Sequence, residues 1–161
     1  MKDKFIPMYM TIAETVAQQS SAKRLQVGAI VVKEDRIISI GYNGMPAGWT
    51  NLCEDTIFVL DEEVMGTDMV ALGYTRSQNG NWFKTVTKEE VIHAEANAIA
   101  KLARSTEAGD GSTMFLTHAP CIQCAKQIYT AGIKSVYYRN SYRDTSGIDF
   151  LTTRQVEVKQ V

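Results

Sequence analysis

The chain has 161 residues and a mass of 17.9 kDa, the size of one domain with its own hydrophobic core. Hydrophobic residues make up 45% of it, charged residues 22% and aromatic residues 9%, which excludes disordered, collagen-like and disulfide-scaffold proteins. With 17 Lys and Arg against 18 Asp and Glu, the net charge of -1 disfavours nucleic acid as a partner.

Neither a membrane span nor a secretory signal is visible in the sequence. No apolar run approaches the roughly 18 residues that a membrane-spanning helix needs. Residues 1–5 include an acid and are soon followed by Pro7, so a continuous apolar signal segment is missing. The expectation is a cytoplasmic protein, in the host cytoplasm if a virus encodes it, with no membrane partner. Its three cysteines, few and odd in number, then favour thiol or metal chemistry over disulfides: Cys53, Cys121 and Cys124.

The first predicted elements are a helix and a hairpin. Residues 4–19 carry apolar side chains at spacings of three and four, the period of an amphipathic helix. Two short β-branched runs follow, at 27–32 and 36–42, with only charged residues between them. This arrangement predicts two strands joined by a tight turn.

The middle of the chain has no clear periodicity. From residue 43 to about residue 87, Gly, Pro and Asn interrupt every pattern, although 57–65 is compatible with a short helix. The chain is therefore predicted to be a single domain over 1–161, with a variable insertion at about 52–90.

Helices and strands alternate in the second half. Strong helix formers predict a helix over 91–104, and a strand is expected at 114–117. A helix over 121–131 stops at a glycine before a strand over 133–138, and a small helix and strand are expected within 148–161. The whole order predicts an α/β fold led by an antiparallel edge pair.

Two short motifs carry the chemistry. An H-A-E motif at 93–95 opens a predicted helix, and a P-C-I-Q-C motif at 120–124 lies where a strand passes into the next helix. Two thiolates and one imidazole are typical zinc ligands, and three protein ligands leave the fourth position open to water, as in catalytic sites. Glu95 is then placed to take a proton from that water and pass it on. The predicted zinc ligands are His93, Cys121 and Cys124.

H-x-E followed by P-C-x-x-C is a known signature of the zinc-dependent nucleobase deaminases. Each half alone is less specific, because a solvated helix start often holds H-x-E and because redox and structural zinc sites share C-x-x-C. A structural zinc needs a fourth ligand, for which the chain offers His118 and Cys53 at unfamiliar spacings. A thioredoxin-like redox motif would leave His93 and Glu95 without a role.

Further segments resemble the cytidine deaminase superfamily and, more closely, its deoxycytidylate (dCMP) deaminases. G-Y-N-G-M-P at 41–46 is the discriminating segment, because cytidine, tRNA adenosine, guanine and riboflavin-pathway deaminases share the two zinc motifs. The similar segments span residues 20 to about 145: 27–29, 41–46, 93–99, 120–126 and 131–134.

This resemblance implies a three-layer α/β/α cytidine deaminase-like fold with a central mixed sheet of about five strands. It implies a hydrolase that converts dCMP to dUMP and ammonia and so feeds dTMP synthesis in pyrimidine metabolism. In such an enzyme Glu95 gives the water proton to the adjacent ring nitrogen and later assists the departure of ammonia. The resemblance further implies a homohexamer activated by dCTP and inhibited by dTTP, with one Zn2+ per chain and Mg2+ accompanying the effector triphosphate.

Substrate and effector residues also follow from the resemblance. Asn43 is expected against the sugar, Tyr142 on the pyrimidine ring, Ala94 elsewhere in the substrate site and Arg24 on the 5'-phosphate. From the residues alone, Asn43 is equally a turn residue, Tyr142 a half-buried surface tyrosine, and Arg24 with Lys23 a pair of solvated charges. The implied allosteric nucleotide site consists of Gly41, Tyr42, Asn43 and Gly44.

Some relatives carry a second zinc near the insertion, built from cysteine and extra histidines. This chain has only His93 and His118, so one zinc is predicted and Cys53 is interpreted as a small packed or partly exposed thiol. The alternatives are deamination of another cytosine nucleotide or nucleoside, deamination of an RNA base, and a non-catalytic zinc or nucleotide sensor. An RNA base deaminase needs a basic groove with aromatic platforms, and a sensor has no need of Glu95 as a proton shuttle.

Overall fold

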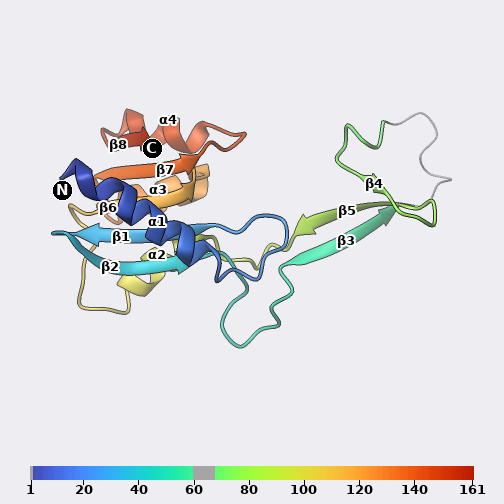
Figure 1. Ribbon diagram of the computed structural model, residues 1–161, viewed down its shortest axis with the longest axis horizontal. Helices are drawn as coiled ribbons and strands as arrows, with labels where there is room; N and C mark the ends of the chain where they lie inside the picture. Colours follow the sequence, from blue (N-terminus) through green and yellow to red (C-terminus); the bar gives the residue numbers. More distant parts are fainter. Residues whose placement is uncertain (1, 60–67) are drawn as a thin grey trace.

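A computed structural model describes residues 2–59 and 68–161 of the chain. Its body is built on a mixed five-stranded sheet in the order β2-β1-β6-β7-β8 (Figure 1). β1 is antiparallel to β2 and to β6, whereas β7 is parallel to β6 and to β8. The mixed sheet expected from the sequence is thus confirmed. Its strands are β1 (Gly28–Lys33), β2 (Arg36–Tyr42), β6 (Thr113–His118), β7 (Ser135–Asn140) and β8 (Glu157–Gln160).

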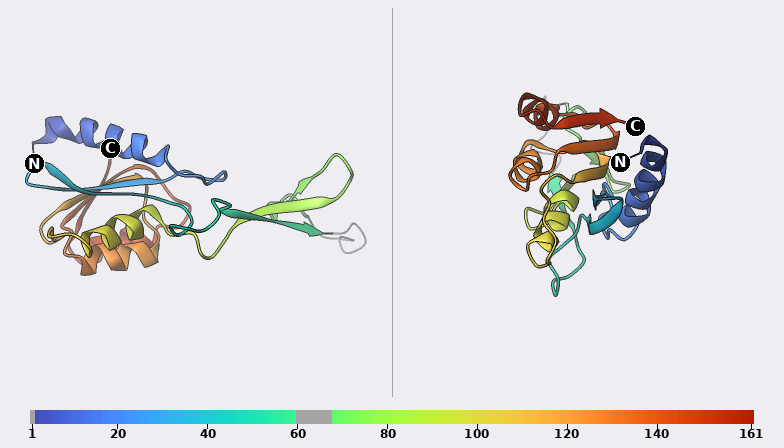
Figure 2. Two further views of the ribbon diagram at one scale, coloured as in Figure 1. Left: turned by 90° about the horizontal axis from the view of Figure 1, so that it is seen from below. Right: turned by 90° about the vertical axis from the view of Figure 1, so that its left-hand side faces the viewer.

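Helices cover both faces of this sheet, so the three-layer α/β/α prediction is confirmed. α1 lies on one face, and the other three described helices lie on the opposite face (Figure 2). None of the described helices is long and apolar enough to cross a membrane. The helices are α1 (Ile6–Ala17), preceded by a 3-10 turn (Asp3–Phe5), α2 (Ala94–Leu102), α3 (Ile122–Thr130) and α4 (Ser146–Thr153).

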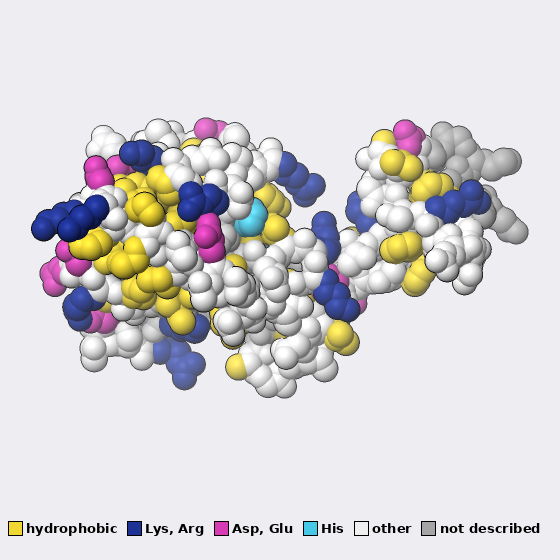
Figure 3. All heavy atoms as spheres, in the orientation of Figure 1, with side chains coloured by type: hydrophobic (Ala, Val, Ile, Leu, Met, Phe, Trp, Pro, Cys, Tyr) yellow, Lys and Arg dark blue, Asp and Glu magenta, His cyan; other side chains and the backbone are white. Residues whose placement is uncertain are grey.

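An arm projects from one end of the body, and a gap separates its distal part from the body (Figures 1 and 3). It is an antiparallel sheet in the order β3-β5-β4, with Phe58 and Phe83 as a cross-strand pair whose ring centroids lie 6.2 Å apart. The arm strands are β3 (Glu54–Val59), β4 (Thr75–Arg76) and β5 (Trp82–Thr87).

The helix predicted at 57–65 is wrong over 57–59, which belong to β3, and 60–67 lie outside the described residues. Residues 56–59 are β-branched or aromatic, and each pairs with a residue of β5. Such side chains suit a pleated surface when a partner strand is available. That partner comes from about 25 residues further along the chain, beyond the reach of local periodicity.

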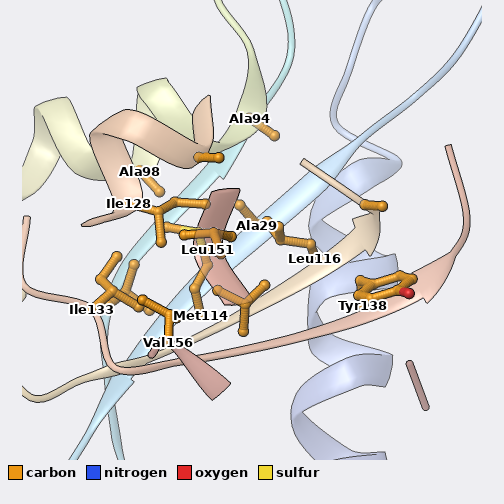
Figure 4. Close-up of a cluster of buried hydrophobic side chains, with 14 of the residues drawn as sticks. Ala29, Ala94, Ala98, Met114, Leu116, Ile128, Ile133, Tyr138, Leu151 and Val156 are labelled. Carbon is orange, nitrogen blue, oxygen red and sulfur yellow. The ribbon is translucent and has the colours of Figure 1, made fainter. Parts of the chain in front are cut away.

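The core forms because strand side chains alternate between the two faces. Ile30 and Phe115 pack with Met10 in the α1 layer, whereas Val31 and Met114 belong to the layer of the other helices. Figure 4 shows this second cluster. All five side chains are fully buried, and each contributes about 1.5–3 kcal/mol of transfer free energy. These two clusters attach α1 to one face of the sheet, and α2 and α3, which carry the zinc motifs, to the other.

Local signals located most element ends correctly. The hairpin between β1 and β2 turns at Glu34 and Asp35, whose φ values of 50° and 59° are those of a tight left-handed turn. The helix predicted from residue 91 begins instead at Ala94. The preceding residues are held by a bridge in which Gly44 and Ile92 exchange two main-chain hydrogen bonds. This tertiary pairing delays the helix so that His93 precedes its first turn.

Candidate active site

The three predicted zinc ligands meet where two helices begin. His93 and Cys121 are the extended residues immediately before α2 and α3, and Cys124 lies in the first turn of α3. Their ligand atoms all lie within 4.8 Å of one another. His93 Nδ1 is 3.7 Å from Cys121 Sγ and 3.4 Å from Cys124 Sγ. A single cation can therefore contact all three side chains.

This donor set fits Zn2+, which prefers thiolate sulfur and imidazole nitrogen. In the described part of the chain, neither His118 nor Cys53 joins the cluster. Cys53 is fully buried in a separate small group with Ala22 and Val91, as expected of a packed thiol. The fourth ligand that a structural zinc would need is therefore not supplied by the candidates considered from the sequence.

Electrostatics at the two helix starts favour negative sulfur. Unpaired amides and the positive dipole ends of α2 and α3 face this region. Hydrogen bonds from the Cys124 thiol and from His93 lower the pKa of Cys121 to about 3. The contact with Cys121 in turn raises the pKa of His93. Cys121 is therefore a thiolate at neutral pH, and its negative sulfur is ready to bind a divalent cation.

Glu95 is a buried carboxyl group beside this cluster. It follows His93 by two residues in α2, and only 4% of its surface is exposed. Burial raises the pKa of Glu95, which makes its carboxylate a better proton acceptor than an exposed one. It is not one of the converging ligand residues. Its role as the proton carrier stays a prediction.

A cavity of about 260 Å³ opens beside the cluster. It gathers residues from the loop after α1, the end of β2, the start of α2, the end of β6, the loop after β7 and the base of the arm. Cys124 is buried and is not one of the lining residues. The predicted site residues that line it are Arg24, Asn43, His93, Ala94, Glu95, Cys121 and Tyr142.

The predicted substrate-binding residues Asn43, Arg24 and Tyr142 differ in their hydrogen bonds and in their exposure to solvent. Asn43 accepts a hydrogen bond from the Val27 amide and donates one to the Leu25 carbonyl, both at 2.8 Å, so its amide holds this loop against the end of β2. Arg24 is exposed and donates to Thr87 Oγ1 at 3.1 Å. Tyr142 is 36% exposed, which leaves its ring accessible from the cavity.

The rest of the predicted effector segment does not line this cavity. Gly41 lies so close to α2 that a Cβ there would overlap the Ala94 carbonyl oxygen. Asn97 Nδ2 donates to the Tyr42 carbonyl at 2.9 Å, and Gly44 is bridged to the main chain just before His93. The segment is therefore attached directly to the start of α2.

Sequence reasoning missed several lining residues. His118 ends β6 on the cavity wall, with Nδ1 3.2 Å from Thr117 Oγ1, and burial lowers its pKa. The only local signal for a role of His118 in the site is its position three residues before Cys121, and the sequence suggests it only as a possible fourth zinc ligand. Glu54 and Thr87 come from the insertion and face each other in the β3 and β5 pairing. No local pattern marks either of them.

Comparisons with known proteins agree with this geometry. The sequence model of the cytidine and deoxycytidylate deaminase zinc-binding region matches residues 4–140. Deoxycytidylate deaminase of Enterobacteria phage T4 is 36% identical over 151 residues, which cover 83% of this chain and 76% of that protein. ComE operon protein 2 of Bacillus subtilis (strain 168) is 33% identical over 135 residues, and the match spans 84% of this chain but 59% of that protein.

A solved structure is similar over the full length. The crystal structure of dCMP deaminase from the cyanophage S-TIM5, in complex with dCMP and dUMP, superimposes with a TM-score of 0.78. The two chains are 41% identical, and the match covers 100% of this chain and 99% of the other. The likeness therefore includes the arm as well as the body.

Proposed function

The chain belongs to the family of cytidine and deoxycytidylate deaminases, and we propose that it is a zinc-dependent hydrolase that converts dCMP and water to dUMP and ammonia. One observation carries the proposal: a buried carboxyl group, Glu95, lies on the wall of a cavity beside three converging zinc ligands. The names of the phage T4 and S-TIM5 proteins support dCMP as the substrate.

Different residues bind the metal and transfer the protons in the proposed reaction. His93, Cys121 and Cys124 would hold zinc, which when bound lowers the pKa of a water molecule toward neutrality. Glu95 takes a proton from water, and its raised pKa suits a group that must also give that proton away. It delivers the proton to the ring nitrogen next to the carbon that carries the amino group. The oxygen of the same water molecule bonds to that carbon. Glu95 then passes the remaining hydroxyl proton to the amino group, so that the carbon–nitrogen bond breaks and ammonia leaves.

Other residues position the substrate in this proposal. The ring of Tyr142 stacks on the pyrimidine, and the small side chain of Ala94 leaves room for the ring beside the ligands. Asn43 shapes the sugar side of the cavity through its bonds to the 25–27 loop. Arg24 contributes positive charge at the phosphate end. This positioning keeps the reacting carbon next to Glu95.

Replacement of Glu95 tests the proposal directly. Glu95→Gln keeps the side-chain shape but removes the proton acceptor, so kcat for dCMP should fall by about 10²–10⁴-fold. The measurement is ultraviolet-monitored deamination by zinc-loaded protein, with bound zinc quantified in parallel and expected to stay at one per chain. Glu107→Gln, on a surface residue that pairs with Arg36, is the matched control and should keep the wild-type rate.

Two outcomes would contradict this assignment. A Glu95→Gln variant that turns over at the wild-type rate would remove Glu95 from the mechanism. Intact dCMP in the presence of rapid loss of deoxycytidine, cytidine or an RNA base would leave the zinc site in place but overturn the substrate.

Regulation is a finer part of the proposal. We propose that dCTP, with Mg2+ on its triphosphate, activates the enzyme, and that dTTP inhibits it, through Gly41, Tyr42, Asn43 and Gly44 in a cytoplasmic homohexamer. Support comes from the attachment of this segment to α2: a ligand that shifts Gly44 also shifts Ile92 and its neighbour His93. The same assay with added dCTP or dTTP should show faster and slower loss of dCMP, respectively.

A further inference from the structure

We propose that the arm takes part in substrate recognition, because Lys84 of β5 joins Arg24 and Arg143 of the body in a site for the phosphate group of the bound nucleotide. This inference rests on the proposed function and extends it. It makes Lys84 and Arg143 specificity-determining residues that distinguish a nucleotide from a nucleoside.

The site is a second cavity, of about 410 Å³, between the arm and the body. Arg24 and Arg143 line it from the body, and Lys84 lines it from the arm beside Thr75 and Thr85. No Asp or Glu is among the lining residues that the structure describes. Figure 3 shows dark-blue Lys and Arg side chains on both sides of the gap between body and arm. Three cations around one polar cavity attract an anion.

The second cavity adjoins the catalytic one. Arg24 lines both cavities. Tyr142 lines the catalytic cavity, and its neighbour Arg143 lines the second, with the guanidinium carbon 6.0 Å from the centre of the Tyr142 ring. A nucleotide whose base lies on Tyr142 therefore has the cation-lined cavity next to it.

The two carboxylates nearest the cations do not compete with a phosphate in the second cavity. Glu54 lines the catalytic cavity, where its charge repels a phosphate. Its Oε1 accepts hydrogen bonds from the amides of Lys23 and Arg24, at 2.8 and 3.2 Å, and so fixes the loop that carries Arg24. Asp144, beside Arg143, accepts two hydrogen bonds from Ser146 at the start of α4. Both carboxylates are thus held by their own partners.

The cations retain donors for a phosphate. Lys84 Nζ gives one hydrogen bond to the Leu72 carbonyl at 2.8 Å, and an ammonium group has three donors. Arg143 offers the planar fork that matches two phosphate oxygens. The Leu72 bond also orients Lys84 within the cavity, so the arm presents a fixed charge.

The test compares binding of dUMP and deoxyuridine, which differ only in the phosphate, by calorimetry on the full zinc-loaded chain. Lys84→Met and Arg143→Met should each weaken dUMP binding by about tenfold and leave deoxyuridine binding unchanged. Lys84→Arg keeps the charge and should keep most of the affinity.

Two matched controls should bind dUMP like the wild type. Lys33→Met removes a lysine that donates to the Ala108 carbonyl at 3.1 Å, and Arg154→Met removes an arginine 5.8 Å from the Phe150 ring centre.

Unchanged dUMP affinity in both Met variants, or an equal loss for deoxyuridine, would overturn the inference. Inorganic phosphate, titrated as a third ligand, should compete with dUMP; phosphate that binds without competing would show a separate anion site and overturn it as well. Turnover of dCMP is measured separately. A wild-type chain that fails to deaminate dCMP, yet prefers dUMP to deoxyuridine through Lys84 and Arg143, would refute the proposed reaction and retain this site.

Discussion

Asn43 and His118 both line the catalytic cavity, yet their surroundings assign them different chemistry. Both ends of the Asn43 amide are bonded to the main chain, so this residue shapes the loop at Val27. The His118 ring is partly buried, with one nitrogen near Thr117, and its pKa is lowered. A neutral imidazole beside the substrate site can accept or donate a hydrogen bond without adding charge.

His118 should make folding stability depend on pH. The unfolded chain binds a proton at His118 below a pKa of 6.5, whereas the folded chain resists it, so the free energy of unfolding falls as pH drops below that value. His118→Gln removes this contribution, and the slope of unfolding free energy against pH should become shallower in that window. Urea unfolding of both zinc-loaded proteins across this range measures it. Identical slopes would show that His118 titrates alike in the folded and unfolded chains.

At the scale of elements, α4 contacts residues 120–121, which we call the zinc loop because they lead into α3 and include the ligand Cys121. Gly147, near the start of α4, is buried against Pro120, the residue before Cys121. A Cβ at Gly147 would overlap the Pro120 carbonyl oxygen. Only a glycine lets the helix approach the loop this closely. A helix outside the two motifs thus fixes where one zinc ligand lies.

Gly147→Ala should therefore displace the zinc loop. The overlap should lower the free energy of unfolding by about 1–3 kcal/mol, the usual range for overpacking. Zinc should also dissociate faster into a chelator, because Cys121 moves with Pro120. Gly44→Ala, where an added Cβ meets no atom within 4 Å, is the stability control. Wild-type unfolding and zinc release in Gly147→Ala would show that the loop adjusts freely.

At the scale of the whole molecule, the body and the arm contribute different parts of the site. The body supplies the zinc ligands and Glu95, whereas the arm supplies Glu54, Thr87 and Lys84 to the two cavities. The core clusters that hold the sheet consist of body residues. We propose on this basis that the chain is one domain with the arm as an insertion at about 52–90.

A shortened chain tests this division. Thr56 and Thr85 are direct partners across β3 and β5, so an Asn-Gly turn can join them in place of 57–84. The shortened protein should unfold cooperatively and bind one zinc per chain, because its core is intact. Its preference for dUMP over deoxyuridine should fall by about tenfold, because Lys84 is absent while Arg24 and Arg143 remain. Loss of zinc, measured by metal analysis after gel filtration, would show that the arm belongs to the folding unit of the body.

The sequence alone was enough for features that depend on near neighbours. The ligands His93, Cys121 and Cys124 precede or open helices that local patterns predict, and their convergence was expected from zinc-ligand chemistry and from the deaminase signature. The β1–β2 hairpin was predicted from local patterns in the same way, whereas the five-stranded sheet was expected from the resemblance to the cytidine deaminase superfamily. The burial of Glu95 beside them is a finding of the structure.

The tertiary structure decided what depends on distant partners. Residues 57–59 form a strand because β5 pairs with them, and α2 starts late because Gly44 holds Ile92. Glu54, Thr87 and Lys84 reach the cavities only through the fold of the arm. Helix periodicity and metal-ligand spacing are set by bonds a few residues apart and can be predicted from the chain. Strand pairing and cavity walls join residues far apart in sequence, and no local pattern specifies which of them meet.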